Sequence, residues 1–574
     1  MKHTIAVIFL FVLISFLPPS SWAQQKNSTP FNYTINKRVN ASKGVVVSAH
    51  PLASQAGLLI LQKGGNAVDA AIATQLALAV VYPGAGNLGG GGFMVAHLAN
   101  KKNIALDYRE TAPAAASKDM YLDSAGNVQT NLSLDGHLAA GVPGTVAGLF
   151  TSMKYAKLPF STLIESAIRL AERGFAITSS QAKSFNSTKE DFVKFNTSKP
   201  AFVKEQHWNE GDTLIQIDLA NTLKRIRDLG QKGFYEGETA RLIVAEMQKG
   251  GGIISYDDLK NYKAKERTAI VFPYKNTTVV TMPLPSSGGI IIQQMLGMIE
   301  HRDLTAMKFQ TTAAVQLMTE VERRAFADRA EFLGDEDFVK VPVKTLVSKA
   351  YLDERMKSFS ASRAGKSDSI KGGIIPKESL QTTHLSVIDN NGNAVSVTTT
   401  LNNSYGSKTL VSGAGFLLND EMDDFSVKPG VPNMYGAVGN EANAIAPGKR
   451  MLSSMTPTIV LKDDQPFVVA GTPGGTTIPT SVFQTIVNIV DFGLSTDDAV
   501  NKPKFHHQWL PDELYIETGF PENVAKELEA MGYKLKHIAA IGRTEVIKVS
   551  PAKAGKPKFE GVADNRGDDD AEGW

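Results

Sequence analysis

Residues 382–400 read Thr-Thr-His-Leu-Ser-Val-Ile-Asp-Asn-Asn-Gly-Asn-Ala-Val-Ser-Val-Thr-Thr-Thr. Two runs rich in β-branched residues flank the pair Asn391-Gly392, and this order predicts a β-hairpin. The plainest interpretation is an ordinary hairpin with threonines on its solvent face, because threonine is common in strands and a hydroxyl is a poor nucleophile without a neighbouring base. The stretch taken alone favours that interpretation.

A segment rich in Ser, Lys and Gly, residues 358–373, ends shortly before the hairpin and predicts a flexible linker. A threonine that becomes a chain terminus can act as a nucleophile, because its freed α-amino group has a pKa of about 7.7–8.0 and can serve as the base. A linker in this position is where such a terminus could be made. Thr382 is therefore a candidate nucleophile.

The amino-acid composition excludes several kinds of catalytic and binding site. The 574 residues include no cysteine, which excludes disulfides, thiolate metal sites, iron–sulfur clusters and a cysteine nucleophile. The 60 Lys and Arg residues nearly balance the 58 Asp and Glu residues, and the net charge of +2 gives no indication of a nucleic-acid-binding or polybasic membrane-surface protein. With 43% hydrophobic and 21% charged residues, the chain is typical of globular proteins.

The first 23 residues have the pattern of a cleavable export signal. Lys2 and His3 precede an apolar run over residues 5–17, and a proline pair then leads to the small residues Ser21 and Ala23. The run is too short to span a bilayer comfortably, and the alternatives are an uncleaved anchor or a buried core segment. We expect cleavage after Ala23 and a soluble mature protein that is periplasmic or secreted.

Hydrophobic periodicity predicts both helices and strands along the chain. Asn66 suits a helix N-cap, with Asp69 in the first turn near the positive end of the helix dipole, and Pro273 suits the end of a strand. The predicted helices cover residues 51–62, 70–80, 163–173 and 313–332, and the predicted strands cover residues 44–49, 269–272, 277–282 and 459–461. Such a mixture is typical of an α/β layered protein.

Two motifs resemble known ligand sites but lack the context that those sites need. Residues 84–89 match the dinucleotide pattern G-x-G-x-x-G, yet an Ala/Leu-rich helix precedes them rather than a strand, which favours close backbone packing. His506 and His507 are adjacent, so they point apart in regular structure, and no nearby carboxylate cluster supports a metal site. We expect packing or hydrogen-bonding roles for both histidines, and neither a metal nor a cofactor.

Polar and glycine-rich stretches after the hairpin supply the other groups that an acyl-transfer site needs. They are Asn402, the acidic turn at 421–426, Ser453-Ser454 and residues 471–476. Each alone is ordinary. Together they offer acceptors for an ammonium group, hydroxyl donors for a carboxylate and adjacent glycine amides for an oxyanion.

Matches over nearly all of the chain after the signal make it resemble the γ-glutamyltranspeptidases, which are N-terminal nucleophile hydrolases. The matching stretches include Asn-Leu-Gly-Gly-Gly-Gly-Phe at 87–93, Asp-Tyr-Arg-Glu-Thr-Ala-Pro at 107–113, Thr-Thr-His at 382–384, Met-Asp-Asp-Phe at 422–425, Pro-Gly-Gly at 473–475 and Phe-His-His-Gln-Trp at 505–509. The resemblance implies a four-layer αββα sandwich and a precursor that cuts itself between Gln381 and Thr382. The chain would then comprise a signal peptide (1–23), a large subunit (24–381) and a small subunit (382–574), the two subunits forming the sandwich jointly as a heterodimer.

The resemblance also implies a role for each site residue. The nucleophile would attack the γ-carbonyl of a γ-glutamyl amide such as glutathione or glutamine, and water or an amino-acid or peptide acceptor would resolve the ester. Thr382 would be that nucleophile, with Thr400 supporting it, and the N–H groups of Gly474 and Gly475 would form the oxyanion hole. The substrate α-carboxylate would be bound by Arg109, Ser453 and Ser454, and its α-ammonium by Asn402, Glu421 and Asp424. Tyr435 would belong to a lid loop over residues 429–436.

Glu421 departs from the pattern of many bacterial family members, which carry glutamine there. A carboxylate still accepts hydrogen bonds from an ammonium group, and it adds negative charge to the pocket. Two other functions remain open. One is a cephalosporin- or glutaryl-acylase, which handles a side chain without the α-amino group, and the ammonium-binding set Asn402, Glu421 and Asp424 argues against it. The other is a solute-binding protein that captures amino acids or peptides without chemistry.

Overall fold

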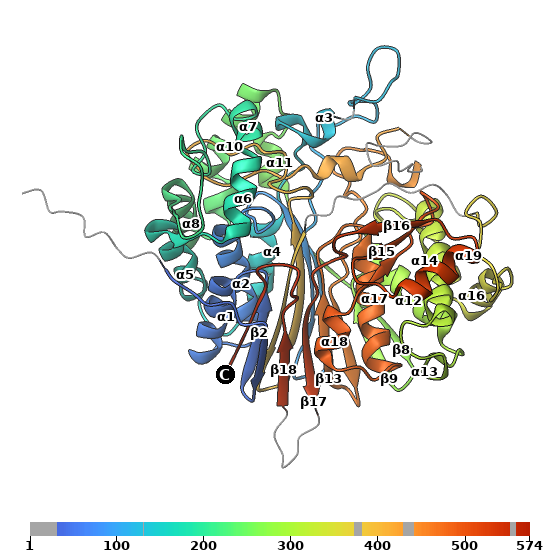
Figure 1. Ribbon diagram of the computed structural model, residues 1–574. Coiled ribbons are helices and arrows are strands. Elements are labelled where there is room, and N and C mark those ends of the chain that lie inside the picture. The colour runs from blue at the N-terminus through green and yellow to red at the C-terminus, as the bar shows by residue number, and fades with distance from the viewer. Residues whose placement is uncertain (1–30, 130, 372–381, 429–440, 551–557) are drawn as a thin grey trace, which may run out of the picture.

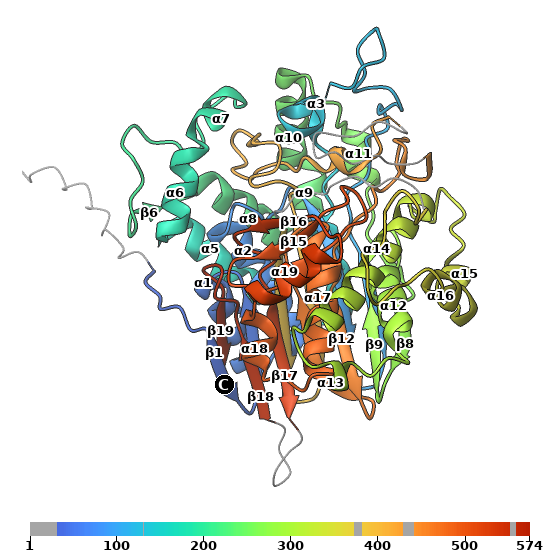
Figure 2. The ribbon, with the colours of Figure 1, turned by 45° about the vertical axis from the view of Figure 1, so that its right-hand side comes forward.

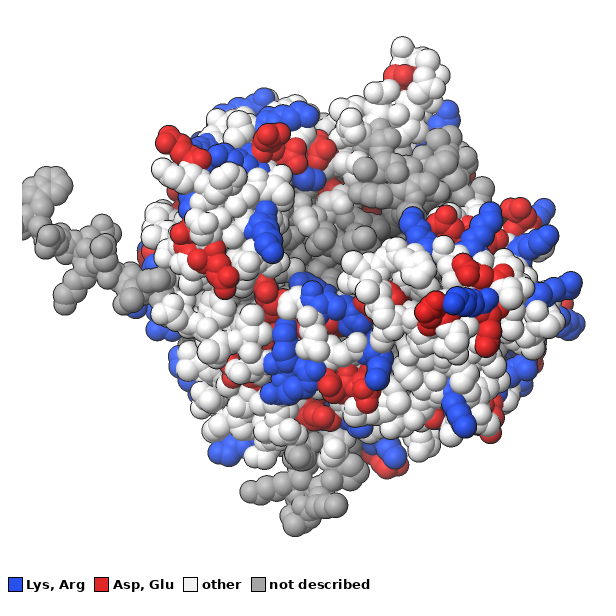
Figure 3. Space-filling view, in the orientation of Figure 1, with Lys and Arg blue, Asp and Glu red and all other residues white. Residues whose placement is uncertain are grey.

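The computed structural model describes residues 31–129, 131–371, 382–428, 441–550 and 558–574. The predicted signal peptide with its cut after Ala23, residue Gln381 and the predicted lid residue Tyr435 lie outside these ranges. Within them, no helix is both long enough and apolar enough to cross a membrane. Acidic and basic side chains are interspersed across the face shown in Figure 3.

Two seven-stranded antiparallel sheets lie face to face at the centre of the molecule (Figure 1). The first sheet has the order β19 (Asp570–Gly573), β2 (Gly44–Ser48), β10 (Thr382–Asp389), β11 (Ala394–Thr400), β3 (Gly91–His97), β4 (Asn103–Asp107) and β7 (Lys265–Arg267). The second sheet has the order β1 (Arg38–Ala41), β18 (Lys558–Val562), β17 (Glu545–Ser550), β13 (Gln465–Gly471), β12 (Thr458–Lys462), β9 (Thr277–Thr281) and β8 (Ile270–Tyr274).

Helices cover the outer side of each sheet. Helices α1 (Pro51–Gln62) and α2 (Ala67–Val81) pack on the first sheet, whereas α12 (Gly288–Ile299) and α17 (Thr477–Val490) pack on the second (Figure 2). The predicted αββα sandwich is therefore confirmed. Smaller pairings join β14 (Phe505–His506) to β15 (Leu514–Glu517) and β16 (Leu535–Ile538), and β5 (Phe175–Ala176) to β6 (Thr213–Leu214).

Strand β2 of the first sheet is buried on both faces. Val46 belongs to the core that includes α1 and α2, whereas Val45 and Val47 belong to the core that includes Val279 and Ile459 of the second sheet. Successive side chains of a strand point to opposite faces, so a strand buried on both faces needs an uninterrupted apolar run. Every residue of β10 and β11 is buried as well, although these strands include polar side chains such as His384 and Ser386, which hydrogen-bond to each other at 3.1 Å. The alternative of a hairpin with solvent-facing threonines is therefore wrong.

The ends of the first two helices follow local rules. Helix α1 occupies the predicted residues 51–62. Helix α2 begins at Ala67, directly after the predicted N-cap Asn66, whose side chain accepts hydrogen bonds from the N–H groups of the second and third helical residues. The Asp69 carboxylate in turn accepts a 2.8 Å hydrogen bond from the N–H of Asn66. This reciprocal pair satisfies donors that a helix start would otherwise leave free. Helices α5 (Phe160–Arg173) and α14 (Thr312–Phe332) are also confirmed.

The prediction that Pro273 ends a strand is wrong, because β8 continues through it to Tyr274. Strand β8 is the last strand of the second sheet and pairs with β9 on one side. An edge strand carries one row of N–H groups without a partner strand, so a proline there need not remove a ladder hydrogen bond.

The prediction of a flexible linker over residues 358–373 is wrong for its described part. Ser367 is buried, and its hydroxyl donates a 2.5 Å hydrogen bond to the Trp509 carbonyl. The Trp509 indole N–H donates in return to the carbonyls of Ser367, at 3.0 Å, and Ile370, at 2.8 Å. Composition alone does not reveal that one buried tryptophan holds a Ser- and Gly-rich segment in place.

Both sheets contain strands from either side of Thr382. In the first sheet β10 and β11 lie between β2 and β3, with Leu385 opposite Ser48 and Thr398 opposite Phe93. In the second sheet β18, β17, β13 and β12 lie between β1 and β9. Neither the residues before Thr382 nor those after it contain all the strands of either seven-stranded sheet.

Candidate active site

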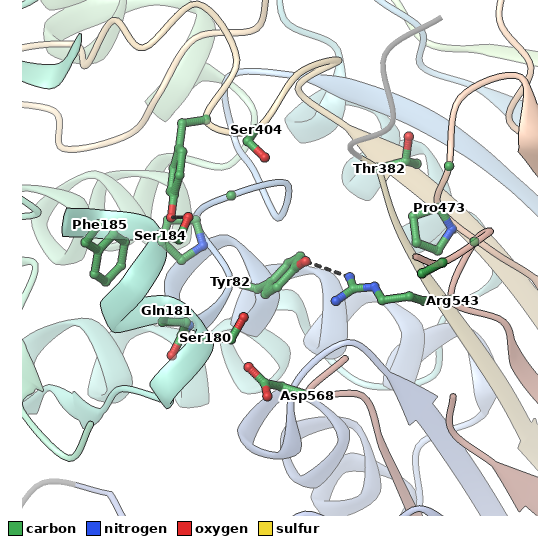
Figure 4. Close-up of a pocket in the computed structure, with 16 residues that line it drawn as sticks. Tyr82, Ser180, Gln181, Ser184, Phe185, Thr382, Ser404, Pro473, Arg543 and Asp568 are labelled. Atoms are coloured by element: carbon green, nitrogen blue, oxygen red, sulfur yellow. Dashed lines mark hydrogen bonds between the residues drawn. The ribbon is translucent and has the colours of Figure 1, made fainter. Parts of the chain in front are cut away.

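Thr382 is the first residue of β10, and it pairs across the strands with Thr400, the last residue of β11. Hydrogen bonds to strands on both sides fix β10 and β11 at the centre of the sheet. Thr382 is only 5% exposed, and its exposed part lines a cavity of about 370 Å³ (Figure 4). The candidate nucleophile therefore lies at the start of a central strand and opens into a space that can hold a small molecule.

A short hydrogen-bonded path leads from Thr400 to the acidic turn. The Thr400 hydroxyl accepts a 2.8 Å hydrogen bond from the N–H of Asn402, whose φ of 76° turns the chain sharply at the end of β11. The Asn402 side-chain amide donates at 3.0 Å to the carbonyl of Asp420. Asp420 immediately precedes the 3-10 helix η3, Glu421–Asp424. The structure therefore connects the threonine pair with the predicted ammonium-binding residues.

Arg109 follows β4 and is the centre of a buried ionic cluster. Its Nη1 lies 2.5 Å from a carboxylate oxygen of Glu421 and 3.6 Å from one of Glu110, and its Nη2 pairs with Asp424. Its Nε donates a 3.3 Å hydrogen bond to the carbonyl of Met451. All four charged side chains are buried, so one guanidinium faces three carboxyl groups with little access to water.

Burial controls the protonation of these carboxyl groups. Desolvation raises the pKa of Glu110 to about 8, although the charge of Arg109 acts against it. Desolvation likewise raises the pKa of Glu421 well above its ordinary value, again opposed by Arg109, and raises the pKa of Asp424. A buried cationic group placed here would favour the ionised forms. The cluster is thus suited to a ligand that carries an ammonium group.

Ser453 and Ser454 lie just beyond Met451, the residue whose carbonyl contacts Arg109. The Ser453 hydroxyl accepts a 3.1 Å hydrogen bond from the N–H of Met455. The Ser454 hydroxyl accepts one of 3.1 Å from Arg329 on α14. Arg329 also lowers the pKa of Asp424 through its charge, so the serine pair and the Arg109 cluster share one electrostatic environment.

Gly474 and Gly475 form the turn between β13 and α17, with φ values of 137° and 55° that favour glycine. A side chain at Gly474 would place its Cβ 2.3 Å from the Thr477 hydroxyl. The two glycine carbonyls accept the first hydrogen bonds of α17, from Thr477 at 3.1 Å and Ile478 at 3.0 Å. Neither glycine N–H has a hydrogen-bond acceptor among the described residues. Two such N–H groups at a helix start can stabilise a negative oxygen.

The predicted site residues fall into two groups. Thr382 and Gly474 line the 370 Å³ cavity together. Glu421 and Asp424 pair with Arg109, and the path through Thr400 and Asn402 leads from Thr382 to the acidic turn that carries them. None of the predicted substrate-binding residues lines the cavity. Reasoning from the sequence missed Glu110 and Arg329. Glu110 lies within a matching stretch and could have been noticed there, whereas nothing in the helical spacing distinguishes Arg329.

The two motifs set aside earlier behave as expected. The stretch at 84–89 packs backbone against backbone, because a Cβ at Gly86 would lie 2.2 Å from the Leu78 carbonyl and one at Gly89 would lie 2.1 Å from the Leu417 carbonyl. The His506 ring bonds to Thr480 at 2.9 Å and to Gln508 at 3.1 Å. The His507 ring lies 3.3 Å from Asp512. These contacts confirm packing and hydrogen-bonding roles.

Two stacked antiparallel sheets covered by helices, with Thr382 at the start of a central strand and a glycine turn beside it, have the fold of the N-terminal nucleophile hydrolases. The family model described as Gamma-glutamyltranspeptidase matches residues 53–574. The chain therefore belongs to the γ-glutamyltranspeptidase family.

Individual relatives agree with this assignment. The Escherichia coli glutathione hydrolase proenzyme is 47% identical over 538 residues, which cover 93% of this chain and 92% of that protein. A cephalosporin acylase from Bacillus halodurans has a TM-score of 0.82 at 26% identity and covers 98% of this chain and 99% of its own. A chain of the Helicobacter pylori γ-glutamyltranspeptidase has a TM-score of 0.56 at 46% identity and covers 60% of this chain and 97% of its own.

Proposed function

We propose that the chain is a precursor that cuts itself between Gln381 and Thr382 and then acts as a γ-glutamyltransferase and glutathione hydrolase. The observation that carries this proposal is the position of Thr382, at a fixed strand end in the same cavity as Gly474. Residues 24–381 and 382–574 would form one heterodimer, exported to the periplasm or secreted after removal of residues 1–23. The donors would be γ-glutamyl amides such as glutathione or glutamine, and the acceptors would be water, amino acids or short peptides.

The proposed reaction is acyl transfer through an ester. The freed α-amino group of Thr382 takes the proton of the Thr382 hydroxyl, whose oxygen attacks the γ-carbonyl carbon. The negative oxygen that forms is stabilised by the N–H groups of Gly474 and Gly475. The amine of the donor leaves with the transferred proton, and a γ-glutamyl ester on Thr382 remains. Water or an acceptor amine attacks that ester, returns a proton to the hydroxyl and regenerates the enzyme.

The charge around Arg109 favours a γ-glutamyl donor over a glutaryl or cephalosporin side chain. The guanidinium suits the α-carboxylate of the donor, joined by Ser453 and Ser454. The surplus of carboxyl groups, including Glu421 and Asp424, suits the α-ammonium, with the Asn402 side chain beside them. A donor whose acyl group lacks the ammonium would leave these carboxyl groups without a cationic partner from the substrate.

Two measurements test the proposed function. The purified protein should give two bands on a denaturing gel, and mass spectrometry should find masses for residues 24–381 and 382–574. It should also release p-nitroaniline from γ-glutamyl-p-nitroanilide at least about 100-fold faster than from glutaryl-p-nitroanilide, since the missing ammonium leaves a buried polar site unpaired. An uncut chain without turnover would instead support a solute-binding protein, and faster glutaryl turnover would support an acylase.

The raised pKa of Glu421 leads to a prediction about pH. The empty pocket holds this carboxyl in its neutral form below the raised value, whereas a bound ammonium favours the ionised form. The KM for γ-glutamyl-p-nitroanilide should therefore fall as pH rises through the raised pKa of Glu421. In Glu421→Gln this fall should be shallower, because glutamine cannot ionise and only Glu110 and Asp424 still titrate.

The control for this prediction is a donor without the ammonium. The KM for glutaryl-p-nitroanilide should show the same pH dependence in both proteins, because the glutaryl group has no ammonium with which Glu421 could pair. Equal slopes for γ-glutamyl-p-nitroanilide in the two proteins would show that Glu421 does not sense the substrate ammonium.

A further inference from the structure

The cavity that contains Thr382 is lined mostly by residues that have no role in the chemistry described so far. It is open to the exterior and polar on several sides (Figure 4). Besides Thr382, Pro473 and Gly474, its charged and hydroxyl-bearing lining residues are Tyr82, Ser180, Ser184, Ser404, Tyr405, Arg543 and Asp568. The predicted γ-glutamyl-binding residues around Arg109 are absent from this lining, so the cavity is available to the other part of a donor or to an acceptor.

Arg543 is the lining residue with the clearest preference for a ligand. Its side chain is 20% exposed, and its Nη2 donates a 2.6 Å hydrogen bond to the Tyr82 hydroxyl. The guanidinium also lies 5.3 Å from the centre of the Tyr82 ring, and its Nε lies 3.9 Å from buried Asp569. A guanidinium has five N–H donors, and this one uses a single donor for a hydrogen bond within the described residues. The remaining donors can form a fork with a carboxylate.

Charges on the other side of the cavity limit which ligand fits. Asp568 lines the cavity and accepts a 2.7 Å hydrogen bond from the Thr178 hydroxyl. In Figure 4, Asp568 and Ser180 lie below Tyr82, while Arg543 lies below Thr382 and Pro473. One partly exposed guanidinium and one carboxylate suit a ligand with a single carboxylate and polar groups better than a dianion.

The backbone couples Arg543 to the glycine turn. The N–H of Arg543 donates a 2.8 Å hydrogen bond to the Thr472 hydroxyl, and Thr472 lies two residues before Gly474. Gly542 has a φ of 66°, and a Cβ there would lie 2.7 Å from the same Thr472 hydroxyl. The segment that carries Arg543 is therefore packed against the segment that would hold the oxyanion. A group bound to Arg543 would have a fixed position relative to an ester on Thr382.

We propose, resting on the transfer reaction proposed above, that Arg543 binds the terminal carboxylate of the leaving amine and of the acceptor. The ligands are α-amino acids and short peptides with a free C-terminus, such as the cysteinylglycine part of glutathione. Their amine reaches the ester on Thr382 while their carboxylate pairs with Arg543. In a donor such as glutathione, Arg109 thus binds the α-carboxylate of the γ-glutamyl group and Arg543 binds the C-terminal carboxylate.

The first test uses the unmodified protein and two acceptors. With γ-glutamyl-p-nitroanilide as donor, glycylglycine should have a kcat/KM about 10- to 100-fold higher than glycylglycinamide, because charge-assisted hydrogen bonds are lost with the amide. The acceptor amines must be compared at equal concentrations of neutral amine. Equal values for the two acceptors would overturn the proposal.

The second test measures the same ratio in variants. In Arg543→Gln the ratio of the two acceptors should fall to about 1, and in Arg543→Lys it should fall several-fold, since lysine keeps the charge but not the fork. Arg241→Gln is the control, because Arg241 is an exposed arginine on α10 (Gly237–Gly250) that pairs with Glu238 and lies outside the cavity. Its ratio should equal that of the unmodified protein.

The ratio within one variant does not depend on how much activity that variant retains. An unchanged ratio in Arg543→Gln or Arg543→Lys would overturn the subsite while leaving the proposed function intact. If Arg543→Gln fails to fold, the Lys variant and the acceptor pair in the unmodified protein decide the question. Absence of cutting and of turnover in the unmodified protein would instead count against the proposed function itself.

Discussion

Replacing Thr382 with alanine is expected to leave a single uncut chain with no measurable turnover. The side-chain oxygen would be lost both for the backbone cut and for attack on a donor, and removing a covalent nucleophile typically lowers kcat by about 10⁴-fold or more. A denaturing gel and mass spectrometry would report the cut, and release of p-nitroaniline from γ-glutamyl-p-nitroanilide would report turnover. A variant that is both cut and active would remove Thr382 from the mechanism.

The neighbouring threonine provides a matched control. Thr383 is fully buried on the same strand, it points to the opposite face of the sheet, and its hydroxyl has no hydrogen-bond partner in the described part of the chain. Thr383→Val keeps the shape of the side chain, so this variant should still be cut and still turn over the donor. If Thr383→Val behaved like Thr382→Ala, loss of function would reflect damage to β10 rather than loss of a nucleophile.

Replacing Arg109 with glutamine should have the second-largest effect. The donor would lose its carboxylate partner, and kcat/KM for γ-glutamyl-p-nitroanilide should fall by about 10²- to 10³-fold, mainly through KM. Three buried carboxyl groups would also lose their nearest cation, and breaking a buried pair typically costs about 3–5 kcal/mol. Steady-state kinetics and thermal unfolding would measure the two effects.

Arg450→Gln separates binding from stability. Arg450 is another buried arginine, 3.3 Å from Asp107, and its Nη2 donates to the Lys263 carbonyl at 2.9 Å. This variant should also lower the unfolding temperature, but it should keep the preference for γ-glutamyl- over glutaryl-p-nitroanilide. An Arg109→Gln protein that kept this preference and an unchanged KM would show that Arg109 serves the fold alone.

Local sequence rules were sufficient to predict much of the helical structure. Proline at the start of α1 and the Asn66–Asp69 capping pair act over a few residues, so their effect can be read without knowing the fold. Pro273 was misjudged because the cost of a proline in a strand depends on whether that strand lies at the edge of a sheet. The segment at 358–373 was misjudged because its order depends on Trp509, a residue distant in the chain.

In the site, too, features that depend on a few neighbouring residues could be predicted, whereas contacts between distant segments could not. Matching motifs allowed Thr382, Arg109 and the glycine turn to be named as candidates, but they carried no distances. The pairing of Arg109 with Glu421 and Asp424 joins segments about 315 residues apart, and that of Tyr82 with Arg543 joins segments 461 residues apart. Such contacts depend on which strands become neighbours, and hydrophobic periodicity does not specify that order.

The interleaving of strands from before and after Thr382 gives the proposed cut a thermodynamic consequence. An intact chain forms both sheets in a unimolecular reaction, because covalent continuity keeps β2 and β3 at a high effective concentration around β10 and β11. Once the bond before Thr382 is broken, the same sheets can be rebuilt only by a bimolecular encounter of two incomplete halves. The mature protein would therefore persist through slow unfolding rather than ready refolding, and its recovery from denaturant should depend on protein concentration.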